Sequence, residues 1–146
     1  KKKDRKSFIE VDYEYSHILA KKAFHAGCKK IAFISAVGSN PKSLNLYLKT
    51  KGTTENTIKQ IGFKSIVFAR PGHLLGIRKN QKNKLLISLF ELFTNIVGLM
   101  MIRGLSKYKN IDAKIVAFSV VKEMKYAKNC INILEYNNMV DIWRKK

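Results

Sequence analysis

Residues 30–35, with the sequence KIAFIS, and residues 64–69, with the sequence KSIVFA, decide the fold of this chain. Both runs are short and apolar on both faces, which predicts strands of a parallel sheet that needs helices on either side. Residues 130–136, CINILEY, form a third run of this kind. Because helical patterns lie between the three runs, we expect an α/β fold built on a parallel sheet.

The helical patterns are periodic. Residues 8–26 are expected to form a helix that ends at Gly27, and the residues on its apolar face would be Val11, Tyr15, Ile18, Leu19 and Ala26. A second helix is predicted for residues 43–60, with Glu55 as a solvated charge. Asp112 is expected to cap a later helix, and the apolar face of that helix would hold Ala113, Val116, Ala117, Val120, Val121 and Met124.

Three strands with two apolar faces would leave a long edge open to pairing. The opening helix also has no strand before it to complete a right-handed crossover, and the chain begins Lys-Lys-Lys-Asp without a Met. We therefore expect the sheet to be incomplete, as part of a longer protein.

The chain has 146 residues and a formal net charge of +19, which raises the question of a polyanionic partner. Of the 29 basic residues, 24 are Lys and only 5 are Arg, and they are scattered along the chain. This distribution is typical of codon bias and solvated surface, so we predict no specific nucleic-acid partner.

Residues 85–102 are apolar enough to suggest a membrane span, but they include Glu91, Thr94 and Asn95. A striped helix over residues 84–105 fits this pattern better than a span. Cys28 and Cys130 show no metal-ligand or disulfide spacing, and we expect both to be buried in a reducing compartment. We expect no signal peptide, and the predicted location is the cytoplasm.

Tyr47 and Lys51 lie one helical turn apart, so their side chains share a face of the second predicted helix. A phenol is a poor acid–base catalyst at neutral pH unless a nearby cation stabilises the phenolate, and Lys51 could supply that charge. Tyr47 would then protonate a carbonyl or deprotonate an alcohol, with Ser35 holding the substrate oxygen. Composition alone predicts about one Tyr-x-x-x-Lys match, so the pair depends on its context after an apolar strand and a Gly-containing loop.

Several segments together resemble an unusual branch of the short-chain dehydrogenase/reductase family. They are Ser35–Asn40, Tyr47–Gly52, Gly62–Phe63 and Arg70–Arg78, with weaker similarity from Val11 to Tyr136. The branch comprises NAD(P)-binding oxidoreductases related to the human HIV Tat-interactive oxidoreductase-like protein and a fungal mitochondrial homologue.

The resemblance implies that the chain is the C-terminal part of a Rossmann-like doubly wound parallel sheet, whose first strands and Gly-rich loop are missing. Residues 1–146 would form one partial NAD(P)-binding domain, with a helix-strand-helix-strand core at 1–77 and C-terminal helices and the last strand at 78–146. The resemblance implies that the catalytic residues are Tyr47, Lys51 and Ser35. It also implies that NAD or NADP is bound by Tyr47, Lys51, Arg70, Pro71, Gly72 and His73.

Two features depart from the family. The expected Ser-Ser pair at the strand end is Ser35-Ala36, with Ser39 as the nearest substitute, and no Gly-rich phosphate loop occurs in the 146 residues. We therefore predict an NAD(P)-dependent oxidoreductase acting on a small carbonyl or alcohol, inactive as this piece. The alternative is a non-catalytic NAD(P)-binding regulator or scaffold. The substrate, the choice of cofactor and the oligomeric state stay open.

Overall fold

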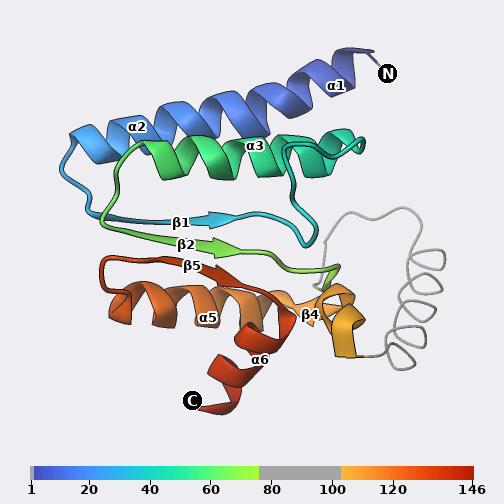
Figure 1. Ribbon diagram of the computed structural model, residues 1–146, viewed down its shortest axis with the longest axis vertical. Helices are drawn as coiled ribbons and strands as arrows, with labels where there is room; N and C mark the ends of the chain where they lie inside the picture. Colours follow the sequence, from blue (N-terminus) through green and yellow to red (C-terminus); the bar gives the residue numbers. More distant parts are fainter. Residues whose placement is uncertain (1, 76–102) are drawn as a thin grey trace.

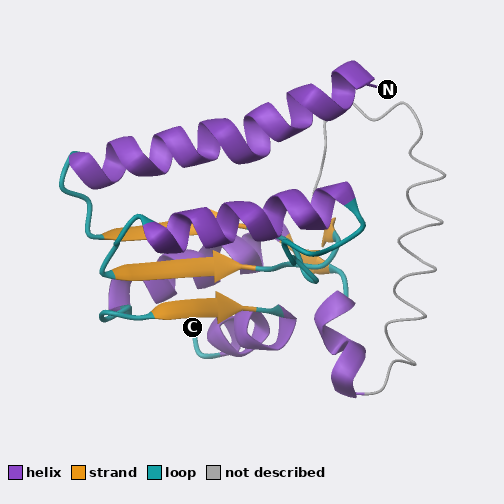
Figure 2. Cartoon of the chain, turned by 45° about the horizontal axis from the view of Figure 1, so that its top comes forward, coloured by secondary structure: helices purple, strands orange, loops and turns teal. Residues whose placement is uncertain are grey.

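The computed structural model describes residues 2–75 and 103–146, and there a parallel sheet lies between two layers of helices (Figures 1 and 2). The helices are α1 (Lys2–Ile9), the π-helical segment η1 (Glu10–Tyr15), α2 (Ser16–His25), α3 (Leu46–Gln60), the 3-10 helix η2 (Arg103–Tyr108), α5 (Ala113–Tyr126) and α6 (Tyr136–Arg144). The strands are β1 (Lys30–Ile34), β2 (Ser65–Ala69), β3 (Leu74–Leu75), β4 (Ile111–Asp112) and β5 (Ile131–Leu134).

The main sheet has the strand order β1-β2-β5, and both pairings are parallel. All five residues of β2 are buried, because β2 lies in the middle of the sheet and has helices on both faces. β1 is only partly buried, although we predicted it to be covered on both faces. In the described part of the chain, no strand pairs with its outer edge.

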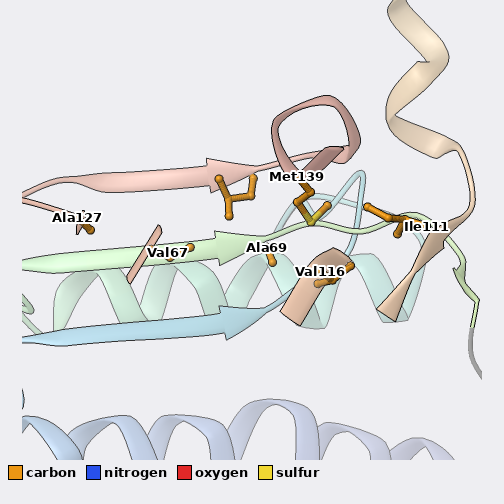
Figure 3. Packing of buried hydrophobic residues seen from close by; sticks show 7 residues of the cluster. Val67, Ala69, Ile111, Val116, Ala127 and Met139 are labelled. Carbon is orange, nitrogen blue, oxygen red and sulfur yellow. The ribbon is translucent and has the colours of Figure 1, made fainter. Parts of the chain in front are cut away.

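The two faces of β2 supply two separate cores, as expected from the alternation of side chains along a strand. Ile66 and Phe68 pack with Ala20 of α2 and Ile58 of α3. The opposite face meets α5, β5 and α6, and this cluster contains Val67, Ala69, Ile111, Val116, Ala127, Leu134 and Met139 (Figure 3). The predicted α/β fold with a parallel sheet is therefore confirmed.

Figure 1 shows α1, η1 and α2 as one long helical rod above α3. Its predicted apolar face was wrong: Val11, Tyr15, Ile18 and Leu19 are between 50% and 70% exposed, while Ala20 is 1% exposed. A π-helical turn widens the winding and shifts the register of all residues after it, which a constant helical period cannot anticipate. The rod ends as predicted, with Gly27 at a φ of 91°.

The predicted C-terminal half also needs correction. The carboxylate of Asp112 caps α5 as expected, accepting a hydrogen bond from the amide of Lys114 at 2.7 Å. However, Val121 is 69% exposed, and Ser119 is fully buried because its hydroxyl donates to the carbonyl of Met139 at 2.9 Å. After β5, residues 136–144 form α6, and Tyr136, which was included in the third predicted strand, begins this helix.

One small element had no counterpart in the sequence analysis. β3 and β4 pair in parallel, Leu74 with Ile111 and Leu75 with Asp112. Two-residue strands carry no periodic signal, so pattern reading misses them. The pairing brings the chain after β2 next to the start of α5.

The stretch 85–102 and nearly all of the striped helix predicted for residues 84–105 lie outside the described residues, and residues 103–105 belong to η2. Among the described helices, none is both long and apolar enough to cross a membrane. The prediction that both cysteines are buried was wrong: Cys28 is exposed after the end of α2, and Cys130 is only partly buried.

Candidate functional site

The predicted site residues gather at the carboxyl ends of β1 and β2. The loop after β1 leads into α3, whose first turns carry Tyr47 and Lys51. Asn45 caps this helix by accepting a hydrogen bond from the amide of Leu48 at 3.2 Å. In parallel α/β sheets, ligands bind outside the carboxyl ends of the strands, so both side chains lie where a ligand would be expected.

Lys51 extends back to the strand end. Its ammonium group donates to the carbonyl of Ile34, the last residue of β1, at 3.3 Å. It also lies 5.0 Å from the centre of the Phe33 ring and 5.9 Å from the centre of the Tyr47 ring. Tyr47 and Lys51 are thus brought together at this edge of the sheet.

The charge of Lys51 already has a partner. Asp12, from η1, forms an ion pair with the Lys51 ammonium, and only 11% of the Lys51 side chain is exposed. The same turn is held to α3 by the Thr54 hydroxyl, which donates to the carbonyl of Asp12 at 3.0 Å. Sequence reasoning gave Asp12 no role, because its 39-residue separation from Lys51 carries no spacing signal.

The phenol of Tyr47 is less acidic than usual. Its pKa is raised above the ordinary value, first by burial and second by the negative charge of Asp12. The catalytic role predicted for Tyr47 needs the opposite shift, a pKa lowered by Lys51. In this arrangement Asp12 offsets the charge that was expected to stabilise the phenolate.

Ser35 is buried, and its hydroxyl lies 2.8 Å from the hydroxyl of Ser39. The Ser39 hydroxyl in turn accepts from the amide of Ala36 at 3.2 Å and lies 2.6 Å from its carbonyl. The two hydroxyls that were considered for holding a substrate oxygen therefore contact each other and close the turn after β1.

The loop after β2 packs directly against the loop after β1. The amide of Ser35 donates to the carbonyl of Ala69 at 2.7 Å, and the amide of Val37 donates to that of Pro71 at 3.0 Å. Gly72 is required here, since a Cβ would lie 2.6 Å from the carbonyl oxygen of Lys109. His73 is exposed, and its backbone joins this loop to the start of β4.

Arg70 is also paired within the chain. Its guanidinium donates two hydrogen bonds to the carboxylate of Glu55, at 2.9 Å and 2.6 Å. The hydrogen bond to Glu55 is the main reason that the pKa of Arg70 is raised. Glu55 is 1% exposed, so its interpretation as a solvated helix charge was wrong. A carboxylate can be buried at this depth only because Arg70 satisfies both of its oxygens.

Together these contacts pair both cations of the predicted site with carboxylates. The two cations nearest the strand ends, Lys51 and Arg70, each pair with a carboxylate, Asp12 and Glu55 respectively. The chain as a whole carries a charge of +19. Among residues 2–75 and 103–146, Lys51 and Arg70 therefore offer no unpaired positive charge to a phosphate group at this edge of the sheet.

A separate groove of about 480 Å³ lies between the helical rod and α3, lined among others by His17, Lys21 and Thr57. None of the predicted site residues lines it. It is therefore a separate feature from the predicted site.

Comparison with known proteins identifies fungal relatives over part of the chain. A Lodderomyces elongisporus protein named "Protein FMP52, mitochondrial" is 43% identical over 75 residues, covering 51% of this chain and 32% of the relative. Proteins of the same name from Debaryomyces hansenii and Saccharomyces cerevisiae are 36% and 38% identical over 92 and 73 residues, covering 40% and 32% of those relatives. The chain thus spans about a third of the length of these curated relatives. It matches no family model.

These comparisons overturn three predictions. The relatives bear a mitochondrial protein name, and none of the three carries a short-chain dehydrogenase or Tat-interactive oxidoreductase name, so the predicted family was wrong. Their name indicates neither an NAD(P)-dependent oxidoreductase activity nor a regulatory role, so the function predicted from the resemblance was wrong. The predicted cofactor, NAD or NADP, is not tested by these names and stays a prediction. The cytoplasmic location was also wrong, because the relatives are named as mitochondrial.

Proposed function

We propose that the carboxyl edge of this sheet binds a small polar ligand, and that this ligand is the nicotinamide–ribose end of NAD or NADP. We propose binding alone, and no hydride transfer. The observation that carries the proposal is the convergence of Tyr47, Lys51 and the two strand-end loops on one edge of a parallel sheet.

The available donors and acceptors fit hydroxyl and carboxamide groups, which carry no negative charge. An ammonium group has three N–H donors, and the contacts of Lys51 with Asp12 and Ile34 use two of them. The Tyr47 side chain is 45% exposed, and its hydroxyl can donate and accept. Ribose hydroxyls and a carboxamide are partners for such groups.

The phosphate and adenine ends of the cofactor have less support. No Gly-rich phosphate loop occurs in the sequence, and the two cations at the edge are each paired with a carboxylate. We therefore expect weak binding that is confined to the nicotinamide half.

Saturation-transfer NMR with NAD⁺ and NADP⁺ tests this proposal on the 146-residue chain. We expect strong saturation of the nicotinamide and adjoining ribose protons, weak saturation of the adenine protons, and a marked loss in Lys51→Met. Lys21→Met is the matched control, because it removes the same charge from an exposed position on α2. No saturation of either dinucleotide, or equal saturation in wild type and Lys51→Met, would refute the proposed site.

We also propose that this sheet is one part of a larger Rossmann-like doubly wound sheet. In the described residues the outer edge of β1 has no partner strand, and the chain spans about a third of its relatives. The outward-facing amides of β1 should therefore exchange with solvent faster than those of β2 when the 146-residue chain is studied alone. Equal protection of the two strands would contradict this.

A mitochondrial location is proposed from the relatives, which are named as mitochondrial proteins. Expression of the full coding sequence fused to a fluorescent protein tests it. Diffuse cytosolic fluorescence that does not overlap a mitochondrial marker would refute it.

A further inference from the structure

The position of Asp12 in the π-helical segment suggests what kind of ligand the site accepts. η1 interrupts the rod between α1 and α2, and the Asp12 carboxylate reaches the Lys51 ammonium across to α3. π-helical turns inside α-helices often occur at functional sites. Here the turn brings a carboxylate to the cation that would otherwise attract an anionic ligand.

We propose that Asp12 determines the charge selectivity of the site, so that the edge of the sheet accepts a neutral hydroxyl- or carboxamide-bearing ligand and rejects a carboxylate or phosphate at the same position. The inference rests on the proposed function, because it describes the ligand that Tyr47 and Lys51 contact. Asp12 itself is a specificity-determining residue and need not touch the ligand.

The physical reason is the cancellation of two charges. An anion that accepts a hydrogen bond from Lys51 also lies close to Asp12, whose carboxylate contacts the same ammonium group. Attraction to Lys51 and repulsion by Asp12 are then of similar size. A neutral oxygen meets no such repulsion and still accepts the remaining N–H of Lys51.

Several contacts keep this pair in place. The Thr54 hydroxyl donates to the Asp12 carbonyl, and the Lys51 ammonium donates to the Ile34 carbonyl. Asp12 and Lys51 are only 24% and 11% exposed as side chains. Salt and water therefore screen the pair less than a surface ion pair. An external anion would have to compete with a partner that is already positioned.

Nicotinamide and nicotinate provide the probe, because they have nearly the same shape and differ in one negative charge. Their dissociation constants are measured by NMR titration against wild type, Asp12→Asn and the control Asp141→Asn. Asp141 is an exposed carboxylate on α6, so its variant makes the same change in net charge away from the site. We expect wild type and Asp141→Asn to prefer nicotinamide.

In Asp12→Asn the ratio of the two affinities should move toward nicotinate by about tenfold, which corresponds to about 1.4 kcal/mol. If both compounds bind and the ratio is the same in Asp12→Asn and wild type, Asp12 does not set the selectivity, although the site exists. If neither compound binds wild type, the proposed binding site itself fails, and the inference fails with it.

The Asp12→Asn substitution leaves Lys51 without a charged partner, so circular dichroism is first used to check that this variant folds. Lys51→Gln supplies a second arm if Asp12→Asn does not fold, because it retains Asp12 and removes the cation. Its affinity ratio should move the other way, further toward nicotinamide. A movement toward nicotinate in Lys51→Gln would overturn the charge argument.

Discussion

The ion pair of Glu55 with Arg70 gives the sharpest test of how the site is held together. Glu55 lies on α3 and Arg70 directly follows β2, so the pair ties the helix that carries the candidate site to the neighbouring strand end. The Glu55 side chain is 2% exposed and the Arg70 side chain 20% exposed. Glu55→Gln keeps the size of the side chain but removes its charge.

The expected loss of stability follows from this burial. Removing one partner of a buried ion pair costs about 3–5 kcal/mol, because the other charge is left uncompensated. Arg70 is partly exposed and regains some hydration, so we expect a loss near the lower limit, about 3 kcal/mol. For a chain of this size that corresponds to a fall in Tm of about 6–12 °C. It should also lower the urea midpoint by about 1–3 M.

Urea denaturation followed by circular dichroism measures this loss. Glu14→Gln is the matched control, because Glu14 is an exposed glutamate on η1 and the net charge changes equally. The double variant Glu55→Leu/Arg70→Met should lose less stability than Glu55→Gln, since no unpaired charge remains. Surface substitutions usually change the free energy of unfolding by no more than about 0.5 kcal/mol. If the free energies of unfolding of Glu55→Gln and the control differ by less than that, the Glu55–Arg70 pair does not hold α3 to the end of β2.

Three further changes test other parts of the structure. The pKa of Tyr47 is raised by burial and by Asp12. The contribution of the Tyr47 phenol to the stability of the fold is therefore intact below about pH 10 and is lost as the pH rises through the folded-state pKa. Urea midpoints measured from pH 9 to 11 should fall less steeply in Tyr47→Phe than in the wild type. Gly52→Ala should destabilise by about 1–3 kcal/mol in thermal melts, because the new Cβ would lie 2.5 Å from the backbone of Asn40, and an unchanged or raised Tm would contradict this close packing. Asp112→Ala should cost about 1 kcal/mol in urea denaturation, whereas Asp112→Asn, which can still accept from the Lys114 amide, should cost much less.

The strands could be predicted from the sequence because their signal is local. The buried run Ser65–Ala69, followed by Arg70 and Pro71, predicts a buried strand and its end. The helix cap at Asp112 and the helix end at Gly27 could be predicted for the same reason, because each acts on backbone groups a few residues away. The ends of the elements differ from prediction by a few residues, which is usual for helix and strand boundaries.

The helix faces could not be predicted as well, because burial depends on what packs against each helix. Val121 continues the apolar repeat of α5 but points to solvent, while the polar Ser119 is buried and bonded to α6. The N-terminal helical rod shows a second reason why the buried face of a helix was predicted wrongly. Its π-helical turn shifts the register, and the side chains that face α3 include Asp12 as well as Ala20.

The candidate site shows the same division between local and long-range information. The pairing of Tyr47 with Lys51 follows from a one-turn spacing on a helix, and their position at the strand end follows from the connection of β1 to α3. The carboxylates that pair with Lys51 and Arg70 could not be predicted from the sequence. Asp12 is 39 residues from Lys51, and Glu55 is 15 residues from Arg70 on a different element, so neither contact leaves a pattern in the sequence.

This division also explains why net charge alone does not describe the surroundings of Lys51 and Arg70. Salt screens the interaction between exposed charges beyond about 8 Å at physiological ionic strength, so a net charge of +19 says little about the field at one position. A ligand at the carboxyl edge is instead governed by the charges within a few ångströms, and there Lys51 and Arg70 are each in contact with a carboxylate. The net charge of a protein therefore need not describe the charge at one edge of its sheet. In this chain the pairing of Lys51 and Arg70 depends on two contacts that connect different helices and strands, so an unpaired cation should appear whenever either carboxylate is removed, even if every lysine on the surface is kept.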